Sequence, residues 1–453
     1  MKHKCQMRRP PTVEDESMDA FLWRHSSFDI APRSSYPHTF MSDQSKRAQY
    51  LVLAAAFLGW MFDGMEMGIF PLVARPALQQ MQTLGHVLDE NFVQRWMGIV
   101  TAFFLLGAAA GGLVFGWLGD RIGRVRAMTW SILSYSLFTG LSYFAVEPWH
   151  LAGLRFIAAL GMGGEWALGV ALVMESWPEA KRPLMASAIG AAGNLGYAVI
   201  AVIAILVPIT TQSWRWVMLV GALPALITFL IRLYVPESEK WKASVKQGPS
   251  RPVREIFGPA LRRNTFLAIA FASIALVVTW GIVQWIPLWA DQMTGGRQPK
   301  VKAWIQLVSA LGAATGCFIA PLLGGRFGRR PVYFGLCLMS LIVCSVLFRG
   351  FHEFNAAFMI MVGVVGFFTA AFYGWLPLYL PELFPTRVRA TGQGLAYNFG
   401  RIIAALGAWQ MGALMGWFDK SYAKAGATIV MIYLLGMVLI WFAPETKGRK
   451  LPE

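Results

Sequence analysis

The most regular feature of the sequence is a series of long apolar stretches separated by short polar ones. A helix needs about 20 apolar residues to cross a bilayer, whereas the strands of a membrane β-barrel would show alternating segments of about ten residues, which are absent. The predicted spans are 49–74, 96–118, 127–146, 150–174, 184–208, 214–235, 265–290, 303–323, 331–348, 356–380, 394–417 and 427–443. The pattern therefore predicts an all-α membrane protein with twelve transmembrane helices.

The composition agrees with a lipid environment. Hydrophobic residues make up 56% of the 453 residues and charged residues only 14%, whereas a soluble domain has about 25% charged residues. The 19 tryptophans and 31 phenylalanines are typical of a protein with aromatic belts at the membrane interfaces. The four cysteines form no C-x-x-C pair and no Cys/His cluster, so we expect neither a metal site nor a disulfide framework.

The positive charge is distributed unevenly between the two sides of the predicted spans. The formal net charge is +16, and the side that holds both termini carries 29 of the 40 Lys and Arg residues. The other side carries 9, and Arg155 and Arg401 lie inside spans. Because cytoplasmic loops are enriched in Lys and Arg, both termini are predicted to be cytoplasmic. Anionic lipid headgroups are then sufficient partners for this charge, and nucleic acid is not needed to explain it.

The sequence repeats itself once. The matched segments are Asp120–Arg124 with Gly325–Arg329, Glu175 with Glu382, Pro236–Ser238 with Pro444–Thr446, and Gly193–Gly196 with Tyr397–Gly400, at offsets of 205, 207, 208 and 204 residues. The expected domains are a basic tail (1–45), a six-helix bundle (46–235), a cytoplasmic linker (236–264), a second six-helix bundle (265–443) and a short tail (444–453). Two halves in the same orientation predict a transporter with its substrate near the midplane between them.

The motifs at the ends of the spans resemble those of a known family. Gly116–Arg124 is similar to the G-x-L-x-D-R-x-G-R motif of the major facilitator superfamily, and Arg155 with Gly161, Gly163 and Gly164 resembles its fourth-helix motif. Pro236–Ser238, Pro381–Arg387 and Pro444–Arg449 resemble signatures of sugar porters and their organic-acid relatives. The resemblance covers about residues 46–453 and implies a multi-pass transporter of the plasma membrane, expected to be a bacterial inner membrane and functional as a monomer.

Two further motifs bear on the substrate. Asp63–Glu66 resembles the D-G-x-D/E motif of organic-acid:proton symporters, and Gly161–Trp166 looks most like sialate and monocarboxylate:proton symporters. The resemblance favours proton symport of a small organic acid, such as a monocarboxylate, an aromatic acid or sialate. A sugar or polyol porter is the second reading, drug:proton antiport the third, and a transporter-like sensor a fourth. No nucleophile–base set or nucleotide motif points to an enzyme or a cofactor.

Charged residues inside spans are costly, so each is a functional hypothesis. We expect Asp63, Glu66 or Glu165 to carry the coupled proton, with the partner of Glu165 on another span. Arg155 and Arg401 can each grip a carboxylate in two-point fashion; alternatively, Arg155 serves coupling beside Asp63 or Glu165. The remaining candidates for the substrate site are Gln284, Trp280, Tyr373 and Asn398.

The resemblance also implies a cytoplasmic gate. Asp120 is expected to face the positive N-terminal end of the eleventh helix, while Arg121 and Arg124 pair with Glu175 and Glu237. In the second copy Gly325 stands in place of the aspartate, so that copy should lack the contact with a helix N-terminus. Its remaining gate candidates are Arg326 and Arg329, expected to pair with Glu382 and Glu445.

Overall fold

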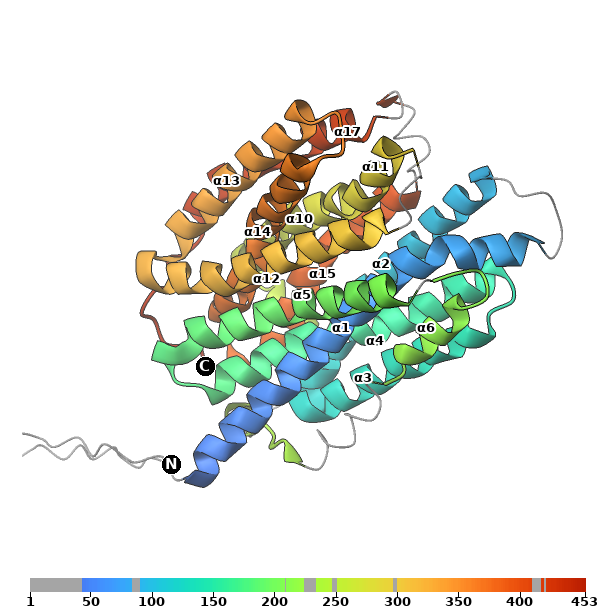
Figure 1. Ribbon diagram of the computed structural model, residues 1–453. Helices are drawn as coiled ribbons and strands as arrows, with labels where there is room; N and C mark the ends of the chain where they lie inside the picture. The colour runs from blue at the N-terminus through green and yellow to red at the C-terminus, as the bar shows by residue number, and fades with distance from the viewer. Residues whose placement is uncertain are drawn as a thin grey trace, which may run out of the picture. The chain divides into compact units, whose positions relative to one another are not determined.

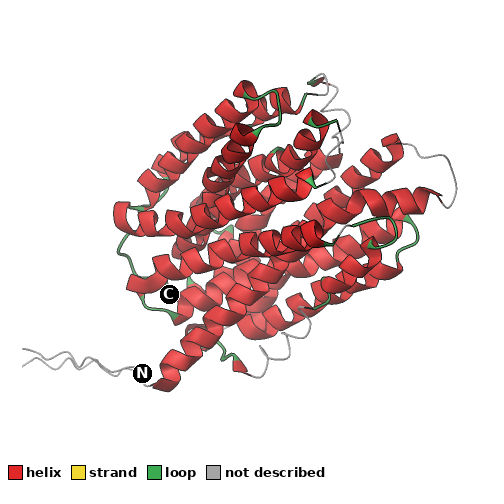
Figure 2. Ribbon diagram, viewed as in Figure 1, coloured by secondary structure: helices red, strands yellow, loops and turns green. Residues whose placement is uncertain are grey.

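The structure is a computed structural model that describes residues 43–83, 90–207, 209–223, 234–246, 251–295, 300–409, 417–418 and 421–453. Residues Asp43–Glu453 form one compact unit. Among the described residues every regular element is a helix, and Figure 2 shows no strand in them. Most of the predicted tail 1–45 lies outside the described residues.

Long helices dominate both halves of the chain (Figure 1). The first half and the linker contain α1 (Asp43–Thr83), α2 (Glu90–Ile122), α3 (Arg124–Leu141), η1 (Ser142–Phe144), α4 (Pro148–Ser176), η2 (Glu179–Lys181), α5 (Arg182–Leu206), α6 (Trp214–Val220), α8 (Glu239–Val245) and α9 (Pro252–Ile256). The second half contains α10 (Arg262–Gly281), η3 (Val283–Trp285), α11 (Ile286–Met293), α12 (Val301–Phe327), α13 (Arg329–Gly350), α14 (Ala356–Tyr379), η4 (Leu380–Leu383), η5 (Thr386–Val388), α15 (Arg389–Trp409), α17 (Tyr422–Ile429), α18 (Ile432–Leu439) and η6 (Ile440–Phe442).

Nine stretches of helix in the described residues are long and apolar enough to cross a membrane. They are Lys46–Gln82, Arg95–Ile122, Pro148–Ser176, Glu179–Leu206, Arg262–Met293, Val301–Phe327, Arg329–Gly350, Ala356–Leu383 and Tyr422–Phe442. The predicted third span coincides with α3, which has fewer apolar residues and begins with two arginines, Arg124 and Arg126. The sixth and eleventh predicted spans extend into residues outside the description. The number of twelve transmembrane helices therefore stays a prediction.

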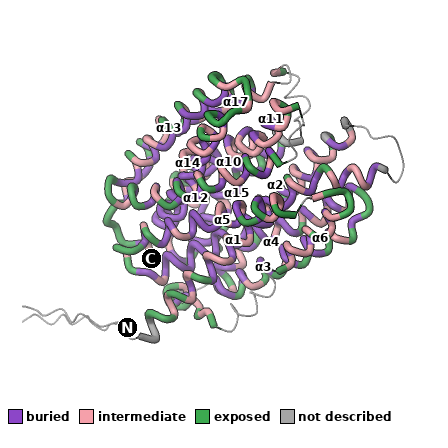
Figure 3. The backbone as a smooth tube through the Cα atoms, viewed as in Figure 1, coloured by how far each residue is buried: buried purple, intermediate pink, exposed green. Residues whose placement is uncertain are grey.

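The main helix contacts come in pairs that the repeat relates to each other. Within the halves α2 packs on α4, and α12 packs on α14. Between the halves α2 packs on α15 and α5 packs on α12, and these two pairs are equivalent because the repeat matches α2 to α12 and α5 to α15. Buried positions concentrate on the faces where these helices meet, while the outward faces of helices such as α13 are more exposed (Figure 3). The start of α1 and the C terminus lie at the same end of the bundle (Figure 1).

Two glycines form identical turns at the matched positions of the repeat. Gly123 has a φ of 110° between α2 and α3, and Gly328 has a φ of 102° between α12 and α13. Other residues rarely adopt this backbone conformation. The turn directs two successive backbone N–H groups at one carboxylate: those of residues 124 and 125 donate to Glu237 at 2.9 and 3.1 Å. Those of residues 329 and 330 donate to Glu445 at 3.0 and 3.1 Å.

Candidate functional site

Asp120 joins the two halves at the end of α2. Its carboxylate accepts hydrogen bonds from the backbone N–H groups of Ala390 and Thr391 at 3.3 and 2.8 Å, and from the Thr391 hydroxyl. These N–H groups belong to the first turn of α15 and have no partner within the helix. Asp120 also accepts a bond of 2.6 Å from Arg124 on its own half. The carboxylate thus lies at the positive end of a helix from the opposite half.

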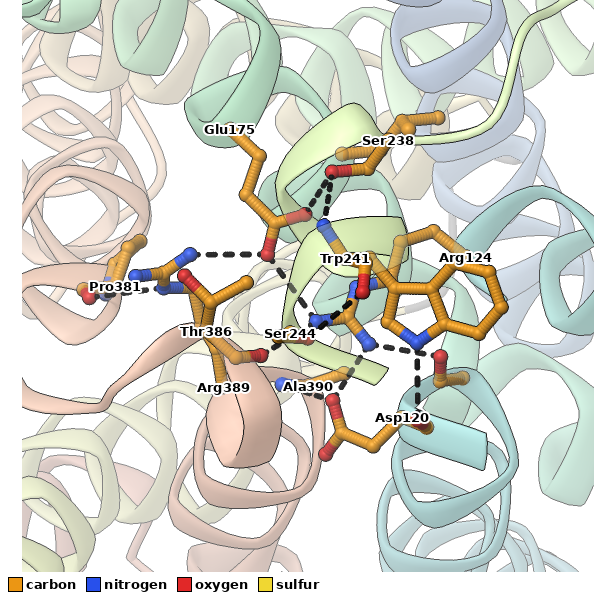
Figure 4. Close-up of polar contacts among 12 residues, drawn as sticks. Asp120, Arg124, Glu175, Ser238, Trp241, Ser244, Pro381, Thr386, Arg389 and Ala390 are labelled. Atoms are coloured by element: carbon orange, nitrogen blue, oxygen red, sulfur yellow. Dashed lines mark hydrogen bonds and ion pairs between the residues drawn. The ribbon is translucent and has the colours of Figure 1, made fainter. Parts of the chain in front are cut away.

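Glu175 makes a second junction beside Asp120 (Figure 4). One of its oxygens accepts hydrogen bonds from Arg124 at 3.2 Å and from Arg389 of α15 at 2.9 Å. The other oxygen accepts a bond from Ser238, the residue that caps α8 of the linker. Arg124 also donates to the Thr386 carbonyl of the second half at 2.8 Å. We call the set Asp120, Arg124, Glu175, Arg389 and Thr391 the latch.

The second copy of these residues forms a network that stays within its own half. Arg329 donates to both oxygens of Glu382, at 3.1 and 2.6 Å, and Thr446 also donates to Glu382. Burial raises the pKa of the Glu445 carboxyl, but hydrogen bonds from backbone N–H groups outweigh burial and hold that pKa below its usual range. Within the described residues, Arg329, Glu382 and Glu445 have no hydrogen bond or ion pair to the first half.

Two predicted gate residues lie outside both networks. Arg121 is exposed and stacks on the Trp117 ring at 4.7 Å, and Arg326 is exposed and stacks on the Phe327 ring at 5.5 Å. Neither side chain forms an ion pair with a described residue. The pairs with gate carboxylates that the sequence predicts for these two arginines are therefore not found among the described residues, because both side chains are exposed and stack on neighbouring rings.

A cavity of about 190 Å³ lies between the halves. Its walls come from α1, α2, α4 and α5 of the first half and from α10, η3, α11, α12, α14 and α15 of the second. Pro71 and Met97 line it near the ends of α1 and α2 that are remote from the latch, and Lys302 does so at the start of α12. The cavity therefore extends from the middle of the bundle toward the end opposite the latch.

Three cations line this cavity in the described part of the chain: Arg155, Lys302 and Arg401. Arg155 is paired with Glu66, which also accepts a bond of 2.8 Å from Thr139. Its partner is thus neither Asp63 nor Glu165. The Lys302 ammonium lies 3.7 Å from Asp291. The third cation, Arg401, forms no such pair with a described carboxylate.

Arg401 has no carboxylate partner among the described residues. One guanidinium nitrogen donates to the Asn398 side-chain oxygen at 2.6 Å, and Nε has no hydrogen-bond partner. The guanidinium carbon lies 5.6 Å from the centre of the Tyr397 ring. Arg401 is only 2% exposed, so a positive charge is buried at the cavity wall with no described carboxylate in ion-pair contact, and a ligand that supplies one would stabilise it.

Asp63 and Glu165 form a pair of buried carboxyl groups next to this arginine. The Glu165 carboxylate lies against Gly59, one helical turn before Asp63 on α1, and the two side chains interact electrostatically. Arg401 also acts on Asp63 through its charge. The exposed fractions are 0% for Asp63 and 2% for Glu165. No described N–H group donates to their four oxygens, and their polar neighbours are each other and the Tyr135 hydroxyl. Buried polar atoms are rarely left this way.

Aromatic side chains make up much of the cavity wall. Trp280 contacts Phe104 across the interface between the halves, with ring centres 5.9 Å apart. The Tyr397 ring stacks on Trp166 at 3.8 Å and meets Trp60 edge-on at 6.3 Å. The predicted residues Trp280, Gln284 and Tyr373 line the cavity.

Asn398, predicted to bind substrate, does not line the cavity. Its amide nitrogen donates to the carbonyls of Gly163 and Gly394, both at 2.9 Å, and its oxygen accepts from Arg401. All of its polar atoms are therefore engaged. Asn398 orients Arg401 and is not available to a ligand.

Several residues of the site escaped the sequence analysis. Arg389 is the repeat partner of Arg182 at an offset of 207 residues, so the repeat could have indicated it. Tyr397 directly precedes the matched Asn398, and this signal was also present. Trp60 and Gln306 carry no comparable signal, because an aromatic or amide side chain within a span packs against neighbouring helices more often than it binds a ligand.

Two helical halves joined by a latch, with a cavity between them that extends toward the end opposite the latch, are the architecture of a membrane transporter. Comparison with known families agrees. A model of the Major Facilitator Superfamily matches residues 51–325, and a model described as "Sugar (and other) transporter" matches residues 293–453. The chain belongs to the major facilitator superfamily and is a multi-pass membrane transporter, not an enzyme.

Relatives extend over most of the chain. A protein of Haemophilus influenzae assigned to metabolite transport is 30% identical over 379 residues, covering 80% of this chain and 90% of its own length. The inner membrane metabolite transport protein YgcS of Escherichia coli is 29% identical, and the match covers 78% of this chain and 84% of YgcS. The cis,cis-muconate transport protein of Acinetobacter baylyi is 29% identical, and the match covers 77% of this chain and 85% of that protein.

The fold matches a solved transporter. The proton:xylose symporter XylE, bound to 6-bromo-6-deoxy-D-glucose, superimposes with a TM-score of 0.72. The match covers 90% of this chain and 98% of XylE at 17% sequence identity. At this identity the likeness establishes the shared fold and does not extend to the substrate.

Proposed function

We propose that the protein is a secondary active transporter that moves a small organic anion together with a proton. The observation that carries the proposal is Arg401, a buried cation at the wall of the cavity with no ion-pair contact to a described carboxylate. A planar guanidinium binds a carboxylate through two parallel hydrogen bonds, and Asn398 holds this one in place. The similarity to relatives described as sialic acid and gentisate transporters also favours an organic acid.

The coupled proton resides on the pair Asp63 and Glu165. Two buried carboxylates that interact directly repel each other when both are charged, so the pair holds at least one proton. The positive charge of Arg401 stabilises the remaining negative charge on Asp63. When a substrate carboxylate binds Arg401 it cancels this field, and the pair then takes up a second proton. Anion and proton thus enter together. Glu66, also predicted to carry the proton, is neutralised by Arg155 and instead joins α1 to α4.

The latch holds the outward-facing state. Its bonds between the halves close the end that the charge distribution assigns to the cytoplasm, while the cavity extends toward the other end. Opening to the cytoplasm requires Asp120 to leave the N-terminal end of α15 and Glu175 to leave Arg389. The excess of Lys and Arg on the side of the termini, and the similarity to an inner membrane protein, support a bacterial inner membrane with both termini cytoplasmic.

Transport into proteoliposomes tests this proposal. The panel is labelled lactate, benzoate, nicotinate, sialate and glucose, each with and without an inward proton gradient. We expect the gradient to drive accumulation of at least one acid. Asp63→Asn should abolish this accumulation but retain exchange of labelled for unlabelled substrate, because exchange needs no net movement of protons.

Other outcomes distinguish the alternatives. Gradient-independent uptake of glucose alone would identify a sugar facilitator and assign Asp63 and Arg401 to structural roles. Accumulation that persists in both Asp63→Asn and Glu165→Gln would exclude the carboxyl pair as the proton site. A signal of substrate binding without any uptake or exchange would favour a sensor.

A further inference from the structure

A second group of polar side chains lines the cavity from elements other than α15, the helix that carries Arg401. It consists of Tyr197 of α5, Gln284 of η3 and Gln306 of α12, and we call it the neutral pole because none of its members is charged. Gln284 donates a hydrogen bond of 3.0 Å to the Tyr197 hydroxyl oxygen. The Gln306 amide nitrogen and the Tyr197 ring both adjoin Gly68 of α1, lying 3.1 and 3.3 Å from where a Cβ at that position would be. The three side chains thus form one cluster.

The neutral pole has hydrogen-bond donors that lack acceptors. Gln306 is 7% exposed and its Nε2 has no hydrogen-bond partner, although it lines the cavity. The Tyr197 hydroxyl accepts from Gln284, and no bond donated by that hydroxyl is found among the described residues. A buried donor without an acceptor is destabilising. Both donors can bind one acceptor oxygen of a ligand in the cavity.

The charges of the cavity limit what that ligand can be. The first two of its three cations, Arg155 and Lys302, form ion pairs with carboxylates, so among the described residues of the cavity wall only Arg401 offers a positive charge that is not in an ion pair. A ligand with one carboxylate matches that charge. The second carboxylate of a dianion would meet amide and hydroxyl groups without a free cation, and burying an unpaired charge costs far more than burying a neutral polar group.

Building on the proposed function, we infer that the substrate is a monoanion with a neutral hydrogen-bond acceptor at the end opposite its carboxylate. The carboxylate binds Arg401, the apolar middle lies among the aromatic rings of the wall, and the acceptor oxygen receives hydrogen bonds from Gln306 and Tyr197. A hydroxyl, carboxamide or ring oxygen fits this description. Unsubstituted acids lack the second contact, and dicarboxylates carry a charge that the neutral pole does not match.

Two matched series of acids test this inference at two molecular lengths. The first is benzoate, 4-hydroxybenzoate, 4-carbamoylbenzoate and benzene-1,4-dicarboxylate; the second is cinnamate with the same substituents. Dissociation constants are measured on the purified protein by quenching of tryptophan fluorescence, since Trp60 and Trp280 line the cavity. One of the two series should match the length of the cavity. In that series we expect the acids with a neutral substituent to bind about tenfold more tightly than the unsubstituted acid. The dicarboxylate should bind no better than the unsubstituted acid.

Variants of Gln306 identify the residue responsible. Gln306→Leu should abolish the preference for the neutral substituents, and Gln306→Lys should shift the preference to the dicarboxylate by supplying a cation. Ser309→Ala is the matched control, because Ser309 lines the same cavity from the same helix and should leave the preference unchanged. If Gln306→Leu fails to fold, a gain of dicarboxylate binding in Gln306→Lys still shows whether Gln306 sets the preference.

The results separate this inference from the function on which it rests. If acids bind and Arg401→Gln abolishes their binding, but the dicarboxylate binds best or Gln306→Leu keeps the preference, the neutral pole has no role in specificity while the organic-acid transporter stands. If no acid of either series binds and none of the labelled acids is accumulated, the proposed function fails and the inference fails with it.

Discussion

Replacing Asp120 with asparagine gives the sharpest test of the latch. The substitution preserves the shape of the side chain but removes its charge, and it places an amide group, itself a donor, among the N–H groups of Ala390 and Thr391. These two bonds and the one from the Thr391 hydroxyl cross between the halves, so they exist only when the latch end is closed. The bond to Arg124 lies within the first half and is available in both states.

The size of the effect follows from this division. A carboxylate at a partly buried helix N-terminus contributes up to about 2 kcal/mol. Since only the bonds between the halves differ between the two states, Asp120→Asn should shift the equilibrium toward the inward-facing state by about 2 kcal/mol, or about thirtyfold. Glu382→Gln is the matched control: its hydrogen bonds to Arg329 stay within the second half, and its link to the first half is an electrostatic attraction to Arg182 without a hydrogen bond, so it should lower stability and shift this equilibrium much less than Asp120→Asn.

Distances between spin labels can measure the shift. Labels at positions 95 and 300, both exposed and on opposite halves near the end of the bundle remote from the latch, report whether that end is open. The labels are introduced by cysteine substitution in a background without the native cysteines. Asp120→Asn should increase the population of the short distance. An unchanged distribution in Asp120→Asn, or an equal shift in Glu382→Gln, would refute the assignment of the latch to one copy of the repeat.

Three further substitutions give independent checks. Arg401→Lys keeps the charge but loses two-point binding, so we expect the apparent affinity for the transported acid to fall about tenfold in uptake assays while proton dependence remains. Gly64→Leu should lower the melting temperature of the purified protein, at a cost of about 1–3 kcal/mol, because a Cβ there collides with the Gly193 carbonyl between α1 and α5. Glu445→Gln should cost less than about 1 kcal/mol, since Glu445 is partly exposed. The depressed pKa of Glu445 makes this contribution full above about pH 4.3 and lost as the pH falls below the folded-state pKa, so the two melting temperatures should converge in acid.

The long helices could be predicted from the sequence because the bilayer sets their length and composition. The positions of the latch could be predicted as well, because the motif and the repeat place Asp120 and Glu175 at the ends of spans. Arg121 and Arg326 were assigned wrongly for a local reason. Charge and spacing do not reveal which of two arginines three residues apart faces the gate carboxylates. That depends on how each helix is rotated about its axis.

The same limit applies to the charges inside the membrane. Asp63 and Glu66 are three residues apart on α1 and lie on one face, so the sequence could not decide which of them meets Arg155. In the structure the rotation of α1 directs Glu66 to Arg155 and Asp63 to Glu165. One carboxylate is thereby neutralised and the other two form the unpaired site. The chemistry of the pair follows from helix packing.

The difference between the two copies of the latch has a structural cause on both sides of the interface. In the first copy Asp120 binds the N–H groups of residues 390 and 391 in the first turn of α15. The repeat matches Ala390 to Pro183 in the first turn of α5, and proline has no N–H group to donate. Position 325, which corresponds to Asp120, is a glycine that packs against Pro183. A carboxylate at 325 would lack one of its two backbone partners and would crowd the proline ring, so the loss of the aspartate and the presence of the proline are consistent with each other. The free energy that closes this end therefore depends mainly on the first copy, and the second copy braces its own half while the two halves move.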